Sequence, residues 1–173
     1  MEWYETVFEF IDTRSFSNMW FWIALAVLWS TASHWVLGVP YDLILRAKRS
    51  GGRVQADMES MVRINADRML YIVRRAGMWL VGLVAMLVSA LFLLGFVYGQ
   101  EFAQAVFCLM APMTLVGGLT LRAAARVEAL RPEGADMHRL LLHHRLTTQG
   151  IGMVAIFFTA LWGMYQNLSV SAL

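Results

Sequence analysis

The sequence predicts an all-α integral membrane protein, a four-helix bundle whose helices extend into the cytoplasm. Hydrophobic residues make up 59% of its 173 positions and charged residues only 15%, whereas soluble domains average roughly 45–50% and 25%. Four stretches also contain no Asp, Glu, Lys or Arg; they cover residues 19–37, 77–98, 102–121 and 150–168. A helix rises about 1.5 Å per residue, so about 20 residues cross a hydrocarbon layer of about 30 Å. Each stretch is therefore predicted to be a transmembrane helix of one membrane domain.

The distribution of basic residues predicts how these spans are oriented. Of the 14 Lys and Arg residues, only Arg14 lies outside two segments, 38–76 and 122–149. Because loops rich in Lys and Arg stay in the cytoplasm, both segments are predicted to be cytoplasmic. Both termini and the short turn at residues 99–101 are then periplasmic. The expected localisation is the bacterial inner membrane, as a multi-pass protein.

The first 14 residues predict an amphipathic helix on the outer side. Acidic residues occupy one face, and the apolar face combines Trp3, Tyr4, Val7, Phe8 and Ile11. Such a helix can lie flat on the membrane surface. Docking of residues 1–14 against the bundle is an equal alternative, because anionic lipid would repel the acidic face.

The first cytoplasmic segment is predicted to be helical with two interruptions. Pro40 lacks an amide donor and predicts a kink or break after the first span, and residues 50–52 (SGG) predict a turn. The pattern over residues 57–75 is helical and continues without Pro or Gly into the second span. Glu59 and Arg63 are four residues apart and are expected to pair along the exposed face of this helix.

The second cytoplasmic segment predicts another helical hairpin. Residues 131–134 (RPEG) predict a turn, and Asp136 is a candidate N-cap for the helix that follows. That helix is expected to cover residues 137–148 and to lead directly into the fourth span. No strand pattern is apparent in the sequence.

Small and weakly polar residues predict the faces on which the spans meet, because lipid provides no hydrophobic drive between helices. The predicted stripe of the last span is Thr148, Gly152, Ala155, Thr159, Gly163 and Gln166. The first span offers Ala26, Ser30, Ser33 and His34, and the third offers Gln104, Cys108, Ala111 and Gly118.

Histidines are the main candidates for a binding site. His34, with Ser30 and Ser33 beside it, lies inside the first span, where an ionisable residue raises a functional hypothesis. It could bind a haem or a quinone, or relay a proton. The alternative is a neutral imidazole that hydrogen-bonds to a neighbouring span.

A second group of histidines, His138, His143 and His144, lies in the second cytoplasmic segment. Their spacing lacks the i, i+4 step that places two metal ligands on one helix face. We therefore expect a solvated face rather than a metal site. A single cysteine, Cys108, excludes an internal disulfide and a cysteine-clustered metal site.

Four segments of the chain resemble a family of small membrane proteins of photosynthetic and related alphaproteobacteria. The segments are residues 14–18 (RSFSN), 29–35 (WSTASHW), 38–42 (GVPYD) and 159–167 (TALWGMYQN). Members of that family often carry the automatic name "component of SufBCD complex". The name implies a link to iron–sulfur cluster assembly. Because this chain supplies neither the cysteines nor the ATPase of that machinery, the resemblance implies at most docking of such a complex on the cytoplasmic side.

The sequence favours a non-enzymatic function without a cofactor. It contains no Ser/His/Asp set, no phosphate-binding loop and no paired carboxylates within the spans, and its net charge of +2 does not indicate nucleic acid. The leading hypothesis is an accessory subunit, scaffold or assembly protein that presents a basic cytoplasmic surface to a protein partner. A redox or small-ligand-binding protein centred on His34 is the first alternative. A channel or passive transporter is the second alternative. A second copy of the chain, in a homo-oligomer, is also a possible partner.

Overall fold

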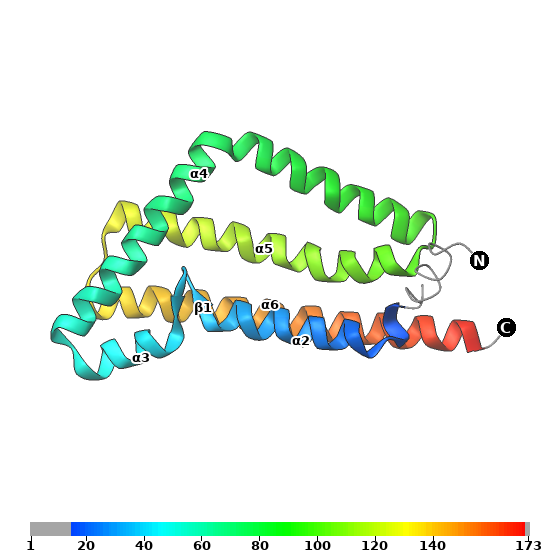
Figure 1. Ribbon diagram of the computed structural model, residues 1–173, viewed down its shortest axis with the longest axis horizontal. Coiled ribbons are helices and arrows are strands. Elements are labelled where there is room, and N and C mark those ends of the chain that lie inside the picture. The colour runs from blue at the N-terminus through cyan, green and yellow to red at the C-terminus, as the bar shows by residue number, and fades with distance from the viewer. Residues whose placement is uncertain (1–14, 172–173) are drawn as a thin grey trace, which may run out of the picture.

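The computed structural model describes residues 15–171, and this part of the chain is almost entirely helical (Figure 1). The all-α prediction is confirmed, whereas the helix predicted at residues 1–14 lies outside the described residues. The elements in order are η1 (Ser15–Ser17), α2 (Met19–His34), β1 (Trp35–Val36), β2 (Val39–Pro40), α3 (Tyr41–Ser50), α4 (Gly52–Phe92), the π-helical turn η2 (Leu93–Val97), α5 (Glu101–Leu130) and α6 (Gly134–Ser171).

Helices α2, α5 and α6 and the second half of α4 run roughly along one axis, whereas the first half of α4 crosses it obliquely (Figure 1). The molecule therefore has two distinct ends. Figure 1 places the α3–α4 turn and the α5–α6 connection together at one end, called here the hairpin end. The other end, called the terminal end, holds η1, the α4–α5 connection and the last turn of α6. Both ends of the described chain therefore lie at the same end of the molecule.

Among the described residues, three helices are long and apolar enough to cross a membrane: Gly52–Val97, Glu101–Leu130 and Gly134–Leu168. They contain the third and fourth predicted spans, and the second except for its last residue, Tyr98. The first predicted span differs, because α2 has 16 residues and ends at His34. At about 1.5 Å per residue, α2 covers about 24 Å, less than the hydrocarbon thickness of about 30 Å.

A tight β-hairpin ends α2 and was not predicted. β1 pairs with β2 in antiparallel fashion, and the two residues between them, Leu37 and Gly38, both have positive φ, 50° and 73°. This is the backbone that a two-residue type I′ turn requires, and glycine adopts it at least cost. Pro40 occupies the end of β2 and precedes α3, so the break predicted at this proline is confirmed, but residues 35–37 are not helical.

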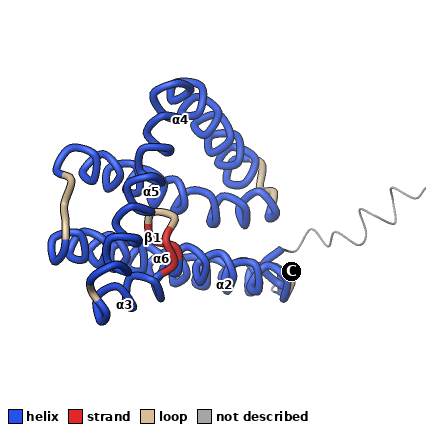
Figure 2. The backbone as a smooth tube through the Cα atoms, turned by 60° about the vertical axis from the view of Figure 1, so that its left-hand side comes forward, coloured by secondary structure: helices blue, strands red, loops and turns tan. Residues whose placement is uncertain are grey.

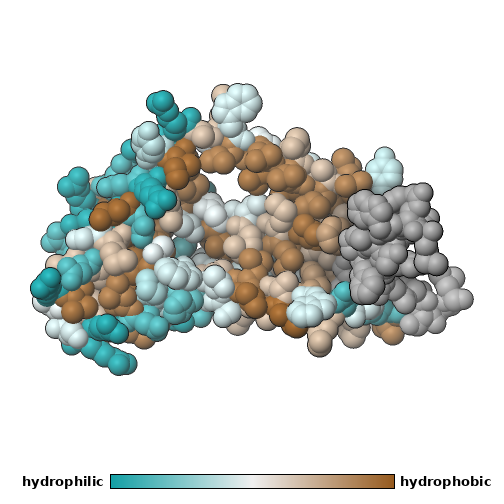
Figure 3. Space-filling model, in the orientation of Figure 1, coloured by the Kyte–Doolittle hydropathy of each residue, from teal (hydrophilic) through white to brown (hydrophobic). Residues whose placement is uncertain are grey.

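The hairpin end holds the larger hydrophobic core. It combines buried side chains from the β-hairpin, α3, the first half of α4, the end of α5 and the start of α6: Val36, Leu37, Val39, Ile44, Ala47, Met58, Val62, Ala66, Leu70, Ala123, Ala124, Val127, Met137 and Leu141. Hydrophilic residues gather over this end in Figure 3, whereas brown apolar residues cover the middle of the molecule. The hairpin end is thus built like a small soluble domain.

A second core joins α2 to α5 and α6 through Leu25, Trp29, Val116 and Ala155. The contact stripe predicted for the last span is largely confirmed, since Thr148, Ala155 and Thr159 are buried. The stripe predicted for the first span is wrong, because Ala26, Ser30 and His34 are exposed. The reason is that α2 packs through large side chains, and the small residues of α6 leave room for them.

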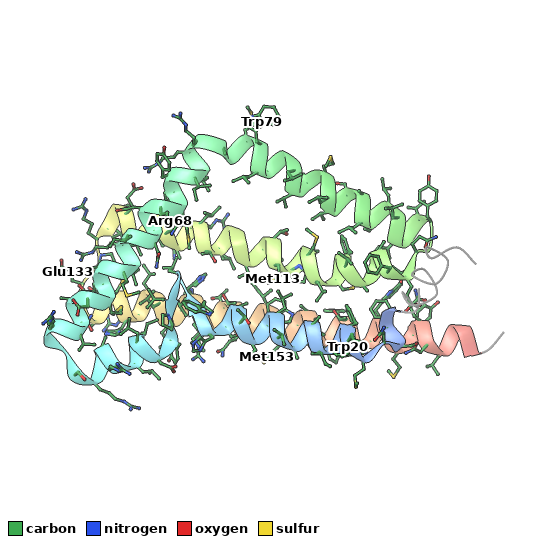
Figure 4. All side chains as sticks on the ribbon, viewed as in Figure 1. Trp20, Arg68, Trp79, Met113, Glu133 and Met153 are labelled. Atoms are coloured by element: carbon green, nitrogen blue, oxygen red, sulfur yellow. The ribbon has the colours of Figure 1, made fainter. Side chains whose placement is uncertain are left out.

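The second half of α4 lies apart from the other helices. All buried residues of α4 precede residue 71, and Trp79, which is 79% exposed, points away from the molecule (Figure 4). Figure 2 shows from another direction that α4 lies over α5, on the side away from α2 and α6. A cleft of about 630 Å³ separates this half of α4 from α5. Helix α4 is therefore anchored mainly at the hairpin end.

Candidate functional site

Glu59 is the polar centre of the hairpin end. Its Oε1 accepts a hydrogen bond from the backbone N–H of Gly134 at 2.7 Å and another from Gln55 Nε2 at 2.6 Å. Its Oε2 lies 3.7 Å from Arg63 Nη2, and Arg63 Nη2 also lies 3.0 Å from Glu133 Oε1. The predicted pairing of Glu59 with Arg63 is confirmed, but Glu59 is buried rather than exposed. Because Gly134 begins α6, Glu59 of α4 satisfies an amide that the helix itself leaves unpaired.

This contact also corrects the prediction that Asp136 caps α6. The helix begins two residues earlier, at Gly134, so Asp136 lies in its first turn. There the carboxylate lies 3.4 Å from Arg139 Nη1, in an exposed pair. An acidic residue in the first turn still interacts favourably with the helix dipole.

Two further polar contacts hold the hairpins together. Asn65 Nδ2 donates to the Gly38 carbonyl at 3.1 Å, which ties α4 to the β-hairpin. Arg74 forms a bidentate pair with Glu128, at 2.9 and 2.6 Å, which ties α4 to α5. Together with the core, these contacts connect every element that meets at the hairpin end.

Arg145 joins α6 to the start of α3. Its guanidinium carbon lies 3.6 Å from the centroid of the Tyr41 ring, and its Nε donates to the Ser33 carbonyl at 3.3 Å. Arginine stacks on aromatic faces in this way because its planar cation is attracted to the electron-rich ring. The end of α2 is thereby held against α6 at the boundary between apolar and polar surface.

The first histidine candidate lies on the surface and lines none of the cavities described between α3, α4, α5 and α6. His34 is exposed at the end of α2, where its ring makes an edge contact with Trp35 at 5.9 Å between centroids. Ser30 is exposed and Ser33 is half-buried. The three residues therefore line one edge of α2 and do not enclose a space for a haem or quinone.

The other three histidines separate into two places. His138 Nε2 lies 2.8 Å from Gln55 Oε1, in a cleft between α3 and α6. Partial burial and then the charge of Lys48 lower the pKa of His138. His143 and His144 line a different, smaller pocket between α5 and α6. Within the described part of the chain, no three His, Cys, Asp or Glu side chains come together as metal ligands.

The cleft that contains His138 is the candidate site for a protein partner. It has a volume of about 440 Å³, and Lys48 and Arg139 lie on its rim, while Ile44 and Leu142 line its apolar wall. Next to it, α3 exposes Arg46, Lys48 and Arg49, called here the α3 basic face. A partly apolar cleft beside clustered positive charge suits an acidic segment with apolar anchors.

A second polar network lies at the terminal end. Gln104, buried as its stripe predicted, donates to the Gly95 carbonyl at 2.8 Å and accepts from Trp162 Nε1 at 2.9 Å and from Gln166. A Cβ at Gly95 would lie 2.9 Å from the Gln104 backbone nitrogen, so only glycine allows this approach of η2 to α5. The network connects η2, α5 and α6 through side chains and one backbone carbonyl, and we interpret it as structural.

Comparison with known proteins gives no relative from which a function could be transferred. The chain matches no protein-family model, no curated protein sequence and no solved structure. Its function must therefore be inferred from the chemistry of its own surfaces.

The role of Glu59 and the cleft around His138 were not predicted from the sequence. Glu59 has the spacing of an ordinary surface ion pair, and its partner Gly134 lies 75 positions further along the chain. The one signal in the sequence was that the carboxylate of Glu59 lies beside the apolar stripe of α4. The cleft depends on how α3 folds back over α6, and the pattern within either helix does not contain that information.

Proposed function

We propose that this protein is a non-enzymatic inner-membrane accessory, scaffold or assembly protein that presents its hairpin end to an acidic protein partner. The observation that supports this most is the construction of that end. A packed core and buried polar contacts hold α3 and the starts of α4 and α6 together, whereas the α3 basic face is exposed. A rigid basic surface of this kind loses little conformational freedom when a partner binds. Subunits of an iron–sulfur assembly complex are the candidate partner that the family resemblance implies.

The proposed topology has four spans, with the hairpin end in the cytoplasm and both termini in the periplasm. It rests on the basic residues, which concentrate in segments 38–76 and 122–149. In this arrangement α2 crosses as a short span, since bilayer thinning and interfacial residues accommodate a mismatch of a few ångströms. The β-hairpin then lies at the inner headgroup level.

Cysteine labelling in whole cells tests this topology. In a Cys108→Ser background, we expect a membrane-impermeant maleimide to label Tyr98→Cys in intact cells, because Tyr98 is exposed at the terminal end. Ser50→Cys and Leu130→Cys, both exposed at the hairpin end, should be labelled only after the cells are permeabilised. Labelling of Ser50→Cys in intact cells would show that the orientation is wrong.

Charge reversal on α3 tests the partner surface. We expect the triple variant Arg46→Glu, Lys48→Glu and Arg49→Glu to lose a partner that purifies stoichiometrically with the wild-type protein in mild detergent, because like charges repel an acidic surface. The matched control is Arg53→Glu, on the exposed start of α4, which should retain the partner. Recovery of only lipid and chaperones with the wild-type protein would count against the proposal, as would equal loss in both variants.

A further inference from the structure

A groove between α5 and α6 has an apolar body. Its volume is about 910 Å³, within the range of about 300–1,000 Å³ of small-molecule sites. The part nearer the hairpin end is lined by Ala111, Pro112, Leu115, Ile151, Val154 and Phe158. These residues belong to the third and fourth predicted spans, so the groove lies at membrane depth and faces acyl chains.

The same groove has a cationic mouth. A small pocket of about 170 Å³ continues it toward the hairpin end, and Thr147 lines both cavities. Arg122 and Arg126, one helical turn apart on α5, lie on one side of this mouth, and His143 and His144 of α6 lie on the other. No carboxylate lines this pocket, and neither arginine pairs with a carboxylate among residues 16–168. The mouth is therefore a positively charged recess at the edge of the bilayer.

We propose that this groove binds one anionic phospholipid of the inner leaflet, with its phosphate between Arg122 and Arg126 and one acyl chain along the apolar body. The inference assigns a ligand site distinct from the α3 basic face, and it rests on the proposed topology only for the choice of leaflet. The arginine fork recognises phosphate oxygens bidentately, and a basic pocket between helices at the cytoplasmic side is suited to an anionic headgroup.

The dimensions of the groove agree with this occupant. A chain from one leaflet reaches about half of the 30 Å hydrocarbon layer, or about 15 Å. That distance corresponds to about 10 residues of helix, which is the separation between Arg122 and Pro112 on α5. The chain would therefore end beside Pro112 and Phe158, which both line the groove. A soluble phosphate compound would leave this apolar part unfilled.

Lipid binding to the purified full-length protein in dodecyl maltoside tests the proposal. We expect native mass spectrometry to retain one phosphatidylglycerol per chain and to show at least a 10-fold preference over phosphatidylcholine of the same chain length. The double variant Arg122→Gln and Arg126→Gln should bind phosphatidylglycerol about 30-fold more weakly, because it removes two basic residues from the headgroup site. The matched control, Arg46→Gln and Arg49→Gln on α3, should bind it like the wild type.

Equal weakening in both double variants would overturn the proposal, since it would indicate only general surface charge. A second variant addresses the apolar body. Ala111→Phe, which fills the groove, should also weaken phosphatidylglycerol binding at least 10-fold, and it decides the matter if the arginine variant does not fold. Inorganic phosphate at millimolar concentration should fail to displace the lipid. Displacement by phosphate, or equal binding of a form with six-carbon chains, would show a free-phosphate site and overturn the proposal.

Discussion

Replacing Glu59 with alanine is expected to lower the free energy of unfolding of the hairpin end by about 2–4 kcal/mol. The carboxylate is buried and holds the Gly134 amide, the Gln55 side chain and Arg63 at the same time. Without it, the first amide of α6 loses its protein partner and the Arg63 guanidinium loses its nearest buried counter-charge. Denaturant titration of the purified protein in detergent, followed by far-ultraviolet circular dichroism, measures the change.

The matched control for this prediction is Asp57→Ala. Asp57 also pairs with an arginine four residues away, at 3.9 Å from Arg53, but both side chains are mostly exposed. Exposed pairs contribute about 0–1 kcal/mol because water and salt screen them, so this variant should resemble the wild type. If both variants were destabilised equally, the assignment of Glu59 as the buried joint between α4 and α6 would be wrong.

The sequence predicts the long helices and most of the connections of this fold. An uncharged stretch of about 20 residues has one stable conformation in lipid, because only a helix satisfies its own backbone hydrogen bonds. Gly51 and Gly52, both with positive φ, form the turn that the SGG signal predicts. Arg131, at φ 42°, and Gly134 likewise form the second turn. These features depend on residues close together in the chain.

The arrangement of the helices is predicted less well, because it depends on residues far apart. Hydropathy indicates which residues avoid water, and it gives equal weight to a lipid-facing and a helix-facing leucine. The prediction that small residues mark the packing face is therefore wrong for α2, although the same argument is correct for α6. Trp29 carries the α2 contact, and a tryptophan in a span is equally compatible with packing and with lipid exposure.

The histidine hypotheses also show that features formed by several helices are hard to predict from the sequence. An ionisable residue within a span indicates function only if neighbouring helices enclose it. His34 lies at the exposed end of α2, whereas the cationic mouth of the α5–α6 groove combines two arginines of α5 with two histidines of α6, which are about 20 positions apart in the single segment 122–149. The position of a positive charge along the membrane normal can be read from the sequence, but its convergence with other charges requires the packing.

The close contact between α2 and α6 yields a prediction with opposite signs for two neighbouring glycines. A Cβ at Gly152 would lie 2.7 Å from Cε3 of the buried Trp29 ring, whereas a Cβ at Gly150 meets nothing within 4 Å. We expect Gly152→Ala to destabilise the protein by about 1–3 kcal/mol, because the ring has no room to move without repacking. Gly150→Ala should instead stabilise it by up to about 1 kcal/mol, since alanine loses less conformational entropy in a helix.

Thermal unfolding of the two variants in detergent distinguishes these effects, and a double variant locates their origin. Trp29→Leu removes the ring with which the new Cβ of Gly152→Ala clashes. The double variant should therefore be destabilised by less than the sum of the two single changes. Residues in contact typically show such coupling at about 0.5–3 kcal/mol, whereas distant sites add within about 0.5 kcal/mol. Strict additivity of the two changes, or equal behaviour of the two glycine variants, would mean that α2 does not pack against α6 through Trp29. Helix α2 would then be held against α6 mainly by its other contacts, Leu25 in the shared core and the Ser33 carbonyl that accepts from Arg145.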